Sequence, residues 1–231
     1  MLLNVKINNI SDLKNSYGHG NILSDVLLYL KNSGADSVSV SLKDCESVLS
    51  EGTFPEIMKT DGLKIYIEVA LKPEMQKAVL KYKPDLCCIV PENNHDYGLN
   101  VAEQMTGIIS FAGPLFMNGI NVCLSVDPEM EQIEASANTG VKYIKLNTAH
   151  YAEAFGTEGE ETELKKLRQA SEFAHNLGLT VIAGGGLNSE NLKRMNEISY
   201  LNEAGTDCSF LPQKALGVCE KTISEIKTLI D

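Results

Sequence analysis

Short apolar runs alternate with amphipathic segments along the whole chain of 231 residues. Runs of strand length are followed by polar loops, and then by segments whose apolar residues recur every three or four positions, the spacing of one helix face. Strands are predicted over residues 2–7, 37–42, 64–70, 86–90, 120–126, 141–147, 180–183 and, weakly, 199–203. Helices are predicted over residues 21–33, 54–60, 73–82, 99–117, 127–138, 157–177, 189–196 and 213–230. This alternation predicts a single (β/α)8 TIM barrel spanning residues 1–231, with a doubly wound open sheet as the alternative.

The net charge and the lengths of the apolar runs limit the kinds of partner that we expect the chain to bind. The formal net charge is −11 and the pI is about 4.9, which argues against nucleic acid, because phosphate backbones require clustered lysines and arginines. No apolar run approaches the roughly 18 residues that a membrane-spanning helix needs, and the amino terminus lacks the layout of a signal peptide. We therefore expect a cytoplasmic protein that binds neither nucleic acid nor membrane.

The six cysteines show no metal-binding spacing. Only Cys87 and Cys88 are adjacent, no C-x-x-C or Cys/His arrangement occurs, and several cysteines lie in apolar runs. This pattern predicts reduced, buried thiols and no bound metal.

Three consecutive glycines, Gly184, Gly185 and Gly186, follow the strand predicted over residues 180–183. Glycine lets backbone N–H groups approach a ligand closely, and a helix beginning at Asn188 or Ser189 would add the positive end of its dipole. Late in a barrel, such a junction of strand, glycines and helix predicts a phosphate-binding site. A tight turn that binds nothing is the alternative.

Polar side chains gather where the predicted strands end, the edge at which barrel enzymes carry their active sites. The candidates outside the glycines are Lys6, Asn8, Asn9, Ser41, Lys43, Glu68, His95, Lys145 and His150. Glu68 and Lys145 interrupt apolar strands, where a charge is costly unless it is paired. Glu68 is therefore either a ligand-facing base or anchor, or a member of a buried ion pair with Lys6, Lys43 or Lys145. His150 is the best-placed histidine for acid–base chemistry, and His95 lies in a polar loop where it can contact a substrate.

Residues 33–40, 81–92 and 177–187 form distinctive framework segments. The segment over residues 81–92, KYKPDLCCIVPE, is similar to the K-P-x-x-C-C-L-V-P-E of the pyridoxine 5′-phosphate synthase family, which the chain resembles from residue 2 to about 228. That family is a (β/α)8 barrel with extra helices that condenses 1-deoxyxylulose 5-phosphate with 3-amino-2-oxopropyl phosphate. It uses no metal or organic cofactor and forms homo-oligomers. The resemblance implies the same fold, phosphorylated small-molecule ligands, no cofactor and a homo-oligomer.

The resemblance also assigns catalytic positions. Glu68 matches the family's catalytic glutamate, whereas the two catalytic histidines of the family correspond to Ser41 and Gly185. Serine does not replace imidazole near neutral pH, and glycine transfers no proton. Because the loss of one well-placed acid or base slows a reaction by about 10²–10⁴-fold, the sequence predicts strongly reduced family activity.

The substrate-binding positions differ as well. The family's V-N-I-D-H corresponds to VKINN over residues 5–9, its H-L-R-E-D to SLKDC over 41–45, and its E-I-H-T-G to KLNTA over 145–149. Substrate contacts are therefore expected from Lys6, Asn8, Asn9, Ser41, Lys43 and His95.

Three functions fit these patterns. The first is a diverged pyridoxine 5′-phosphate synthase working through Glu68, and the second is a non-catalytic paralogue that binds a phosphorylated ligand or a partner subunit. The third is a Schiff-base aldolase-like enzyme, because VKYIKLNT over residues 141–148 looks like the F-I-K-T-S-T motif of deoxyribose-phosphate aldolases. A lysine in a low-dielectric barrel beside other lysines can have a depressed pKa, which would make Lys145 nucleophilic, although the second lysine of those aldolases is missing.

Overall fold

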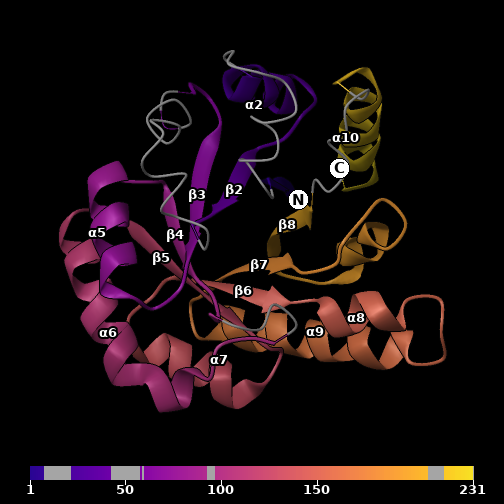
Figure 1. The fold of residues 1–231 in the computed structure, drawn as a ribbon. Helices are drawn as coiled ribbons and strands as arrows, with labels where there is room; N and C mark the ends of the chain where they lie inside the picture. The colour runs from indigo at the N-terminus through magenta and orange to yellow at the C-terminus, as the bar shows by residue number, and fades with distance from the viewer. Residues whose placement is uncertain (8–21, 43–57, 59, 93–96, 208–215, 231) are drawn as a thin grey trace.

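The computed structural model is a closed barrel of parallel strands in the order β1 to β8 (Figure 1). It describes residues 1–7, 22–42, 58, 60–92, 97–207 and 216–230. The strands are β1 (Leu2–Ile7), β2 (Ser37–Ser41), β3 (Lys64–Val69), β4 (Leu86–Ile89), β5 (Asn121–Val126), β6 (Tyr143–Asn147), β7 (Thr180–Gly184) and β8 (Leu201–Asp207). The helices are α2 (Ile22–Asn32), α5 (Pro73–Tyr82), α6 (Val101–Met117), α7 (Met130–Asn138), α8 (Ala149–Ala154), α9 (Glu160–Asn176), the 3-10 helix η1 (Leu192–Glu197) and α10 (Leu216–Ile230). The predicted TIM barrel is confirmed, because β8 pairs with β1 and closes the sheet.

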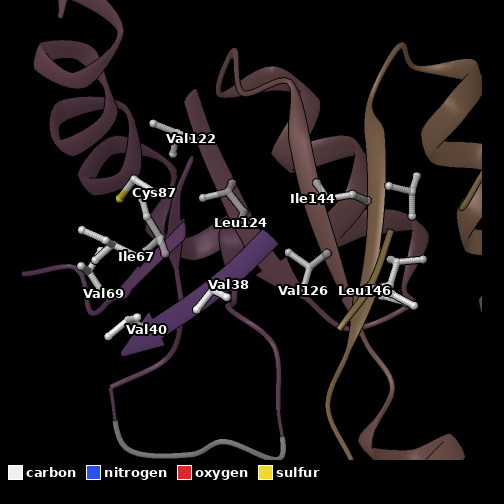
Figure 2. Packing of buried hydrophobic residues seen from close by; sticks show 14 of the residues in the cluster. Val38, Val40, Ile67, Val69, Cys87, Val122, Leu124, Val126, Ile144 and Leu146 are labelled. Carbon is white, nitrogen blue, oxygen red and sulfur yellow. The ribbon is translucent and has the colours of Figure 1, made fainter. Parts of the chain in front are cut away.

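The main hydrophobic core lies between the strands and the surrounding helices. Successive side chains along a strand point to opposite faces, so one set of each strand faces outward beneath the helices. Figure 2 shows part of this layer, which includes Val38, Val40, Ile67, Val69 and Leu124. The layer is almost entirely aliphatic, as the low aromatic content of the chain predicts.

The first and last parts of the chain meet at the amino-terminal end of the barrel (Figure 1). The amino group of Met1 donates to the carbonyl oxygen of Ile230 at 3.3 Å. The Nζ of Lys227 lies 2.6 Å from Oδ2 of Asp36, which also accepts a hydrogen bond from the backbone N–H of Leu3 at 2.8 Å. These contacts fix α10 beside β1 and leave the opposite end for the candidate site.

Three elements differ from the prediction. The eighth strand reaches Asp207 instead of ending at residue 203, because pairing with both β7 and β1 overrides its weak intrinsic propensity. The helix predicted over residues 189–196 is the shorter η1, and α8 was not predicted at all. The helix predicted over residues 54–60 lies almost entirely outside the described residues.

Within the described ranges, no helix is both long and apolar enough to cross a membrane. In the same part of the chain, no group of three or more His, Cys, Asp or Glu residues is placed to hold a metal ion. Cys87, Cys88 and Cys123 are buried and free, which confirms the prediction for these three thiols.

Candidate functional site

Three charged side chains meet inside the barrel, at the half nearer the carboxyl ends of the strands. The Nζ of Lys145 lies 2.6 Å from Oε1 of Glu68, and the Nζ of Lys6 lies 3.0 Å from Oε2 of the same carboxylate. These residues come from β6, β3 and β1, which are not neighbours in the sheet, so their side chains can meet only through the barrel interior. The predicted ion pair of Glu68 is therefore confirmed with two lysines at once, and we call Lys6, Glu68 and Lys145 the interior triad.

The carboxylate is the most deeply buried member of the interior triad. Its side chain is 6% exposed, against 20% for Lys6 and 19% for Lys145. Burial raises the pKa of Glu68, but the ammonium groups of Lys145 and Lys6 outweigh burial and lower the pKa to about 2. Glu68 is thus a fixed anion at neutral pH, with its charge balanced by its two partners.

Lys145 remains an ammonium ion. Burial lowers its pKa, but the carboxylate of Glu68 outweighs burial and holds the pKa above its ordinary value. A Schiff base requires the neutral amine, so the depressed pKa on which the aldolase-like hypothesis depended is wrong for the ligand-free protein.

One hydroxyl and two thiol side chains lie on the same layer of the barrel as Glu68. Ser41 on β2 and Cys88 on β4 are the register partners of Glu68, and Cys123 on β5 is the register partner of Cys88. A hydrogen bond with Cys123 outweighs burial and lowers the pKa of the Cys88 thiol, whereas burial raises the pKa of Cys123. Among the residues that the structure describes, Lys6 and Lys145 are the cations paired with Glu68.

A second buried carboxylate lies deeper in the barrel. Glu203 on β8 accepts hydrogen bonds from the hydroxyl of Tyr66, at 2.9 Å, and from that of Ser37. Asn4 donates from Nδ2 to Oγ of Ser37 at 2.6 Å and accepts at Oδ1 from Oγ of Ser39 at 2.8 Å. Burial raises the pKa of Glu203. Sequence reasoning missed this network because it placed Glu203 at the end of a short strand rather than inside a long one.

The glycine stretch forms a tight turn whose carbonyl groups accept hydrogen bonds from residues outside the turn. The backbone N–H of Thr148 donates to the carbonyl of Gly184 at 3.2 Å, and its hydroxyl donates to that of Gly185 at 2.7 Å. The side chain of Asn191 donates to the carbonyl of Gly186 at 3.0 Å. No acceptor for the N–H groups of Gly185 and Gly186 is found among the described residues. The turn therefore holds two N–H groups that can donate hydrogen bonds to a ligand anion.

The helix dipole does not contribute to this turn as predicted. The Oδ1 of Asn188 accepts from the backbone N–H groups of Glu190 and Asn191, at 2.8 and 3.3 Å, and the Oδ1 of Asn191 accepts from that of Asn188 at 2.8 Å. Such side-chain bonds compete with helix formation, and η1 begins only at Leu192. The predicted helix start over residues 188–191 is wrong, and the glycine N–H groups alone remain as the candidate phosphate contacts.

The glycine turn lies against the interior triad. A Cβ placed on Gly184 would lie 3.5 Å from Cδ of Lys145, so the lysine stem passes over this glycine. Gly185 has a φ of 126°, in the region that favours glycine. A Cβ there would lie 2.7 Å from Oδ1 of Asn147, which accepts a hydrogen bond from the backbone N–H of Ala149 at 3.0 Å. Asn147 thus occupies the space that a side chain at position 185 would need.

The other predicted site residues are not placed at the interior triad by the described part of the structure. His150 lies on α8 with its side chain 49% exposed, about 4.0 Å from Glu153 and with its ring centroid 5.9 Å from that of Tyr97. No contact between His150 and the interior triad is recorded within the described ranges. Asn8, Asn9, Lys43 and His95 lie outside those ranges, so their predicted substrate contacts stay predictions.

Comparison with known proteins identifies the family to which the chain belongs. A family model described as "Pyridoxal phosphate biosynthesis protein PdxJ" matches residues 3–231. The chain belongs to the PdxJ family. A relative from Photobacterium profundum named pyridoxine 5′-phosphate synthase is 29% identical over 238 residues, covering 98% of this chain and 96% of the relative. A relative of the same name from Prochlorococcus marinus is 32% identical over 201 residues, covering 85% and 84% of the two chains.

Solved structures support the same fold. Thiamine phosphate pyrophosphorylase from Pyrococcus furiosus superposes with a TM-score of 0.63 at 13% identity, covering 99% of this chain and 95% of that one. The 3-keto-L-gulonate-6-phosphate decarboxylase from Vibrio cholerae superposes with a TM-score of 0.64 at 12% identity, covering 100% and 97%. At this level of identity the likeness concerns the barrel alone.

The resemblance described above implies that this site departs from the family pattern. On that resemblance Asn147 and Gly185 correspond to histidines, and in the structure a side chain at position 185 would meet Oδ1 of Asn147. On the same resemblance Lys6 and Lys145 correspond to asparagine and glutamate, and in the structure both pair with Glu68. The positions expected to differ from the family pattern therefore lie close together in the barrel.

Proposed function

We propose that this chain acts in the biosynthesis of pyridoxal phosphate as a pyridoxine 5′-phosphate synthase-type enzyme. On this proposal it joins 1-deoxyxylulose 5-phosphate and 3-amino-2-oxopropyl phosphate at the carboxyl end of the barrel, without a metal or organic cofactor. The observation that carries the proposal is the family match over residues 3–231 combined with a carboxylate, Glu68, at the centre of the interior triad. A cytoplasmic location and assembly into a homo-oligomer belong to the same proposal.

The proposed division of labour follows from the chemistry of each group. The ammonium groups of Lys6 and Lys145 stabilise negative charge that develops on a substrate oxygen, an effect that is strongest where water is excluded. Glu68 accepts a proton from the substrate once a ligand has weakened its ion pairs. The N–H groups of Gly185 and Gly186 bind a phosphate oxygen, since successive backbone N–H groups with glycine geometry form anion-binding concavities.

One observation favours a second candidate, a non-catalytic paralogue that binds a phosphorylated molecule. Neither Ser41 nor Gly185 can act as a general acid or base near neutral pH, and Asn147 fills the space beside Gly185. The low pKa of Glu68, about 2, makes it a weak base in the absence of ligand. These features support binding without turnover.

A turnover assay separates the two candidates. Purified protein is incubated with both phosphorylated precursors, and pyridoxine 5′-phosphate is measured by mass spectrometry. We expect product from the wild type and from Glu172→Gln, an exposed control on α9, and none from Glu68→Gln. Absence of product from the wild type, together with calorimetric binding of either precursor, would establish the second candidate and refute the first.

A further inference from the structure

The interior triad has a property that neither the family pattern nor simple phosphate binding explains: its single carboxylate is held by two cations that retain unused donors. An ammonium group has three N–H donors, and the bond to Glu68 uses one on each lysine. Among the described residues, no second acceptor is recorded for either ammonium group. Each lysine therefore has donors with which it can begin to bind a second anion while it is still paired with Glu68.

The members of the interior triad differ in exposure. Both lysine side chains are about one-fifth exposed, at 20% and 19%, whereas that of Glu68 is 6% exposed. The lysines are therefore the members that solvent reaches more readily. Glu68 has Cys88 on β4 as its register partner, and Cys123 on β5 comes next in the same layer.

We propose that Lys6 and Lys145 form a binding site for the anionic group of a phosphorylated ligand, and that this anion competes with Glu68 for the two ammonium groups and so frees the carboxylate to act as a base. The identity of the ligand rests on the proposed function, whereas the competition rests on the geometry of the interior triad. Charges of the same sign in one buried site disfavour each other, so a phosphate anion beside Glu68 weakens the hold of the lysines on the carboxylate. Ligand binding then converts a fixed ion pair into a group that takes up a proton.

Binding of inorganic phosphate to three variants tests the competition. Calorimetry at low salt and pH 7.5 compares the wild type with Lys145→Met, with Glu68→Gln and with Lys142→Met, a control that removes an exposed lysine immediately before β6. We expect Lys145→Met to weaken binding by about tenfold or more, as for loss of a charge-assisted contact, and Lys142→Met to leave it unchanged. Glu68→Gln should bind phosphate about tenfold more tightly, because the competing carboxylate is gone. Equal affinity in all four proteins, or weaker binding by Glu68→Gln, overturns the proposal.

A measurement on the wild type remains informative even where Glu68→Gln does not fold. The carboxyl carbon of Glu68 is observed by NMR in ¹³C-glutamate-labelled protein at pH 4.5, with and without inorganic phosphate. With a pKa of about 2, under about 1% of the carboxyl is protonated at this pH; we expect phosphate to raise that fraction to about a tenth or more as the pKa moves toward its ordinary value. An unchanged resonance at saturating phosphate refutes the competition. Turnover without this change would refute the inference alone, whereas the change without turnover would refute only the proposed enzyme.

Discussion

The interior triad makes the stability of the protein depend on pH in a way that can be isolated. The pKa of Glu68 falls from its ordinary value of 4.5 to about 2 in the folded protein. Each tenfold change in proton affinity is worth about 1.4 kcal/mol, so this drop corresponds to about 3 kcal/mol of folding free energy at neutral pH. The side chain is only 6% exposed, and solvent screening therefore reduces this figure little.

The sign and the pH window follow from the same values. The folded protein binds the Glu68 proton less tightly than the unfolded chain does, so the contribution is complete above about pH 5. It is lost as the pH falls through 4.5 toward 2, and about 2 kcal/mol of it disappears between pH 5 and pH 3.

Urea unfolding at pH 7, 5, 4 and 3 measures this contribution in the wild type and in Glu68→Gln. The variant is expected to be less stable at pH 7, because two buried ammonium groups lose their carboxylate, and its stability should fall less steeply below pH 5. The exposed variant Glu172→Gln serves as the control and should follow the wild type. Parallel pH dependence in the wild type and Glu68→Gln would refute the assignment of a low pKa to Glu68.

Three further predictions concern other parts of the structure. Gly185→Ala should destabilise the protein by about 1–3 kcal/mol. The loss should exceed that of Gly156→Ala, because Gly156 also has a positive φ but has open space around it. Equal melting temperatures for the two variants would contradict the predicted clash between a Cβ at position 185 and Asn147. Borohydride treatment in the presence of aldehyde substrates should add no mass at Lys145, because its amine is protonated, and an adduct seen by peptide mass spectrometry would revive the aldolase-like function. Arg194→Ala should cost about 1 kcal/mol at low salt and less at high salt, because Arg194 joins η1 to α9 through surface carboxylates; a salt-independent cost in urea unfolding would show that the loss is not electrostatic.

The barrel was predictable because each of its strands is specified by a short local sequence pattern, and that pattern repeats along the chain. Each strand is a short aliphatic run, and β1 agrees with its predicted range while most others differ by one or two residues at their ends. The eighth strand was the weakest prediction, since Gly205 and the polar residues around it are poor strand formers. Its identity depends on closure of the sheet between β7 and β1, which no local pattern contains.

The site was predictable in part. A charge inside an apolar strand signals a partner, and this argument correctly identified Lys6 and Lys145 among the candidates for Glu68. The sequence left open both a depressed pKa for Lys145, as the aldolase-like hypothesis required, and an ion pair with Glu68; only the structure shows that the carboxylate pairs with Lys145 and raises its pKa. The close approach of Asn147 to Gly185 was also inaccessible, since it brings the last residue of β6 next to a glycine 38 positions later in the chain.

That close approach has a consequence for how the site can change. A side chain introduced at position 185 meets the amide oxygen of Asn147. The two positions therefore constrain each other, so a single substitution at Gly185 is unfavourable while Asn147 keeps its present place. Introducing a histidine at position 185 therefore requires a compensating change at position 147, and the two substitutions are expected to be non-additive.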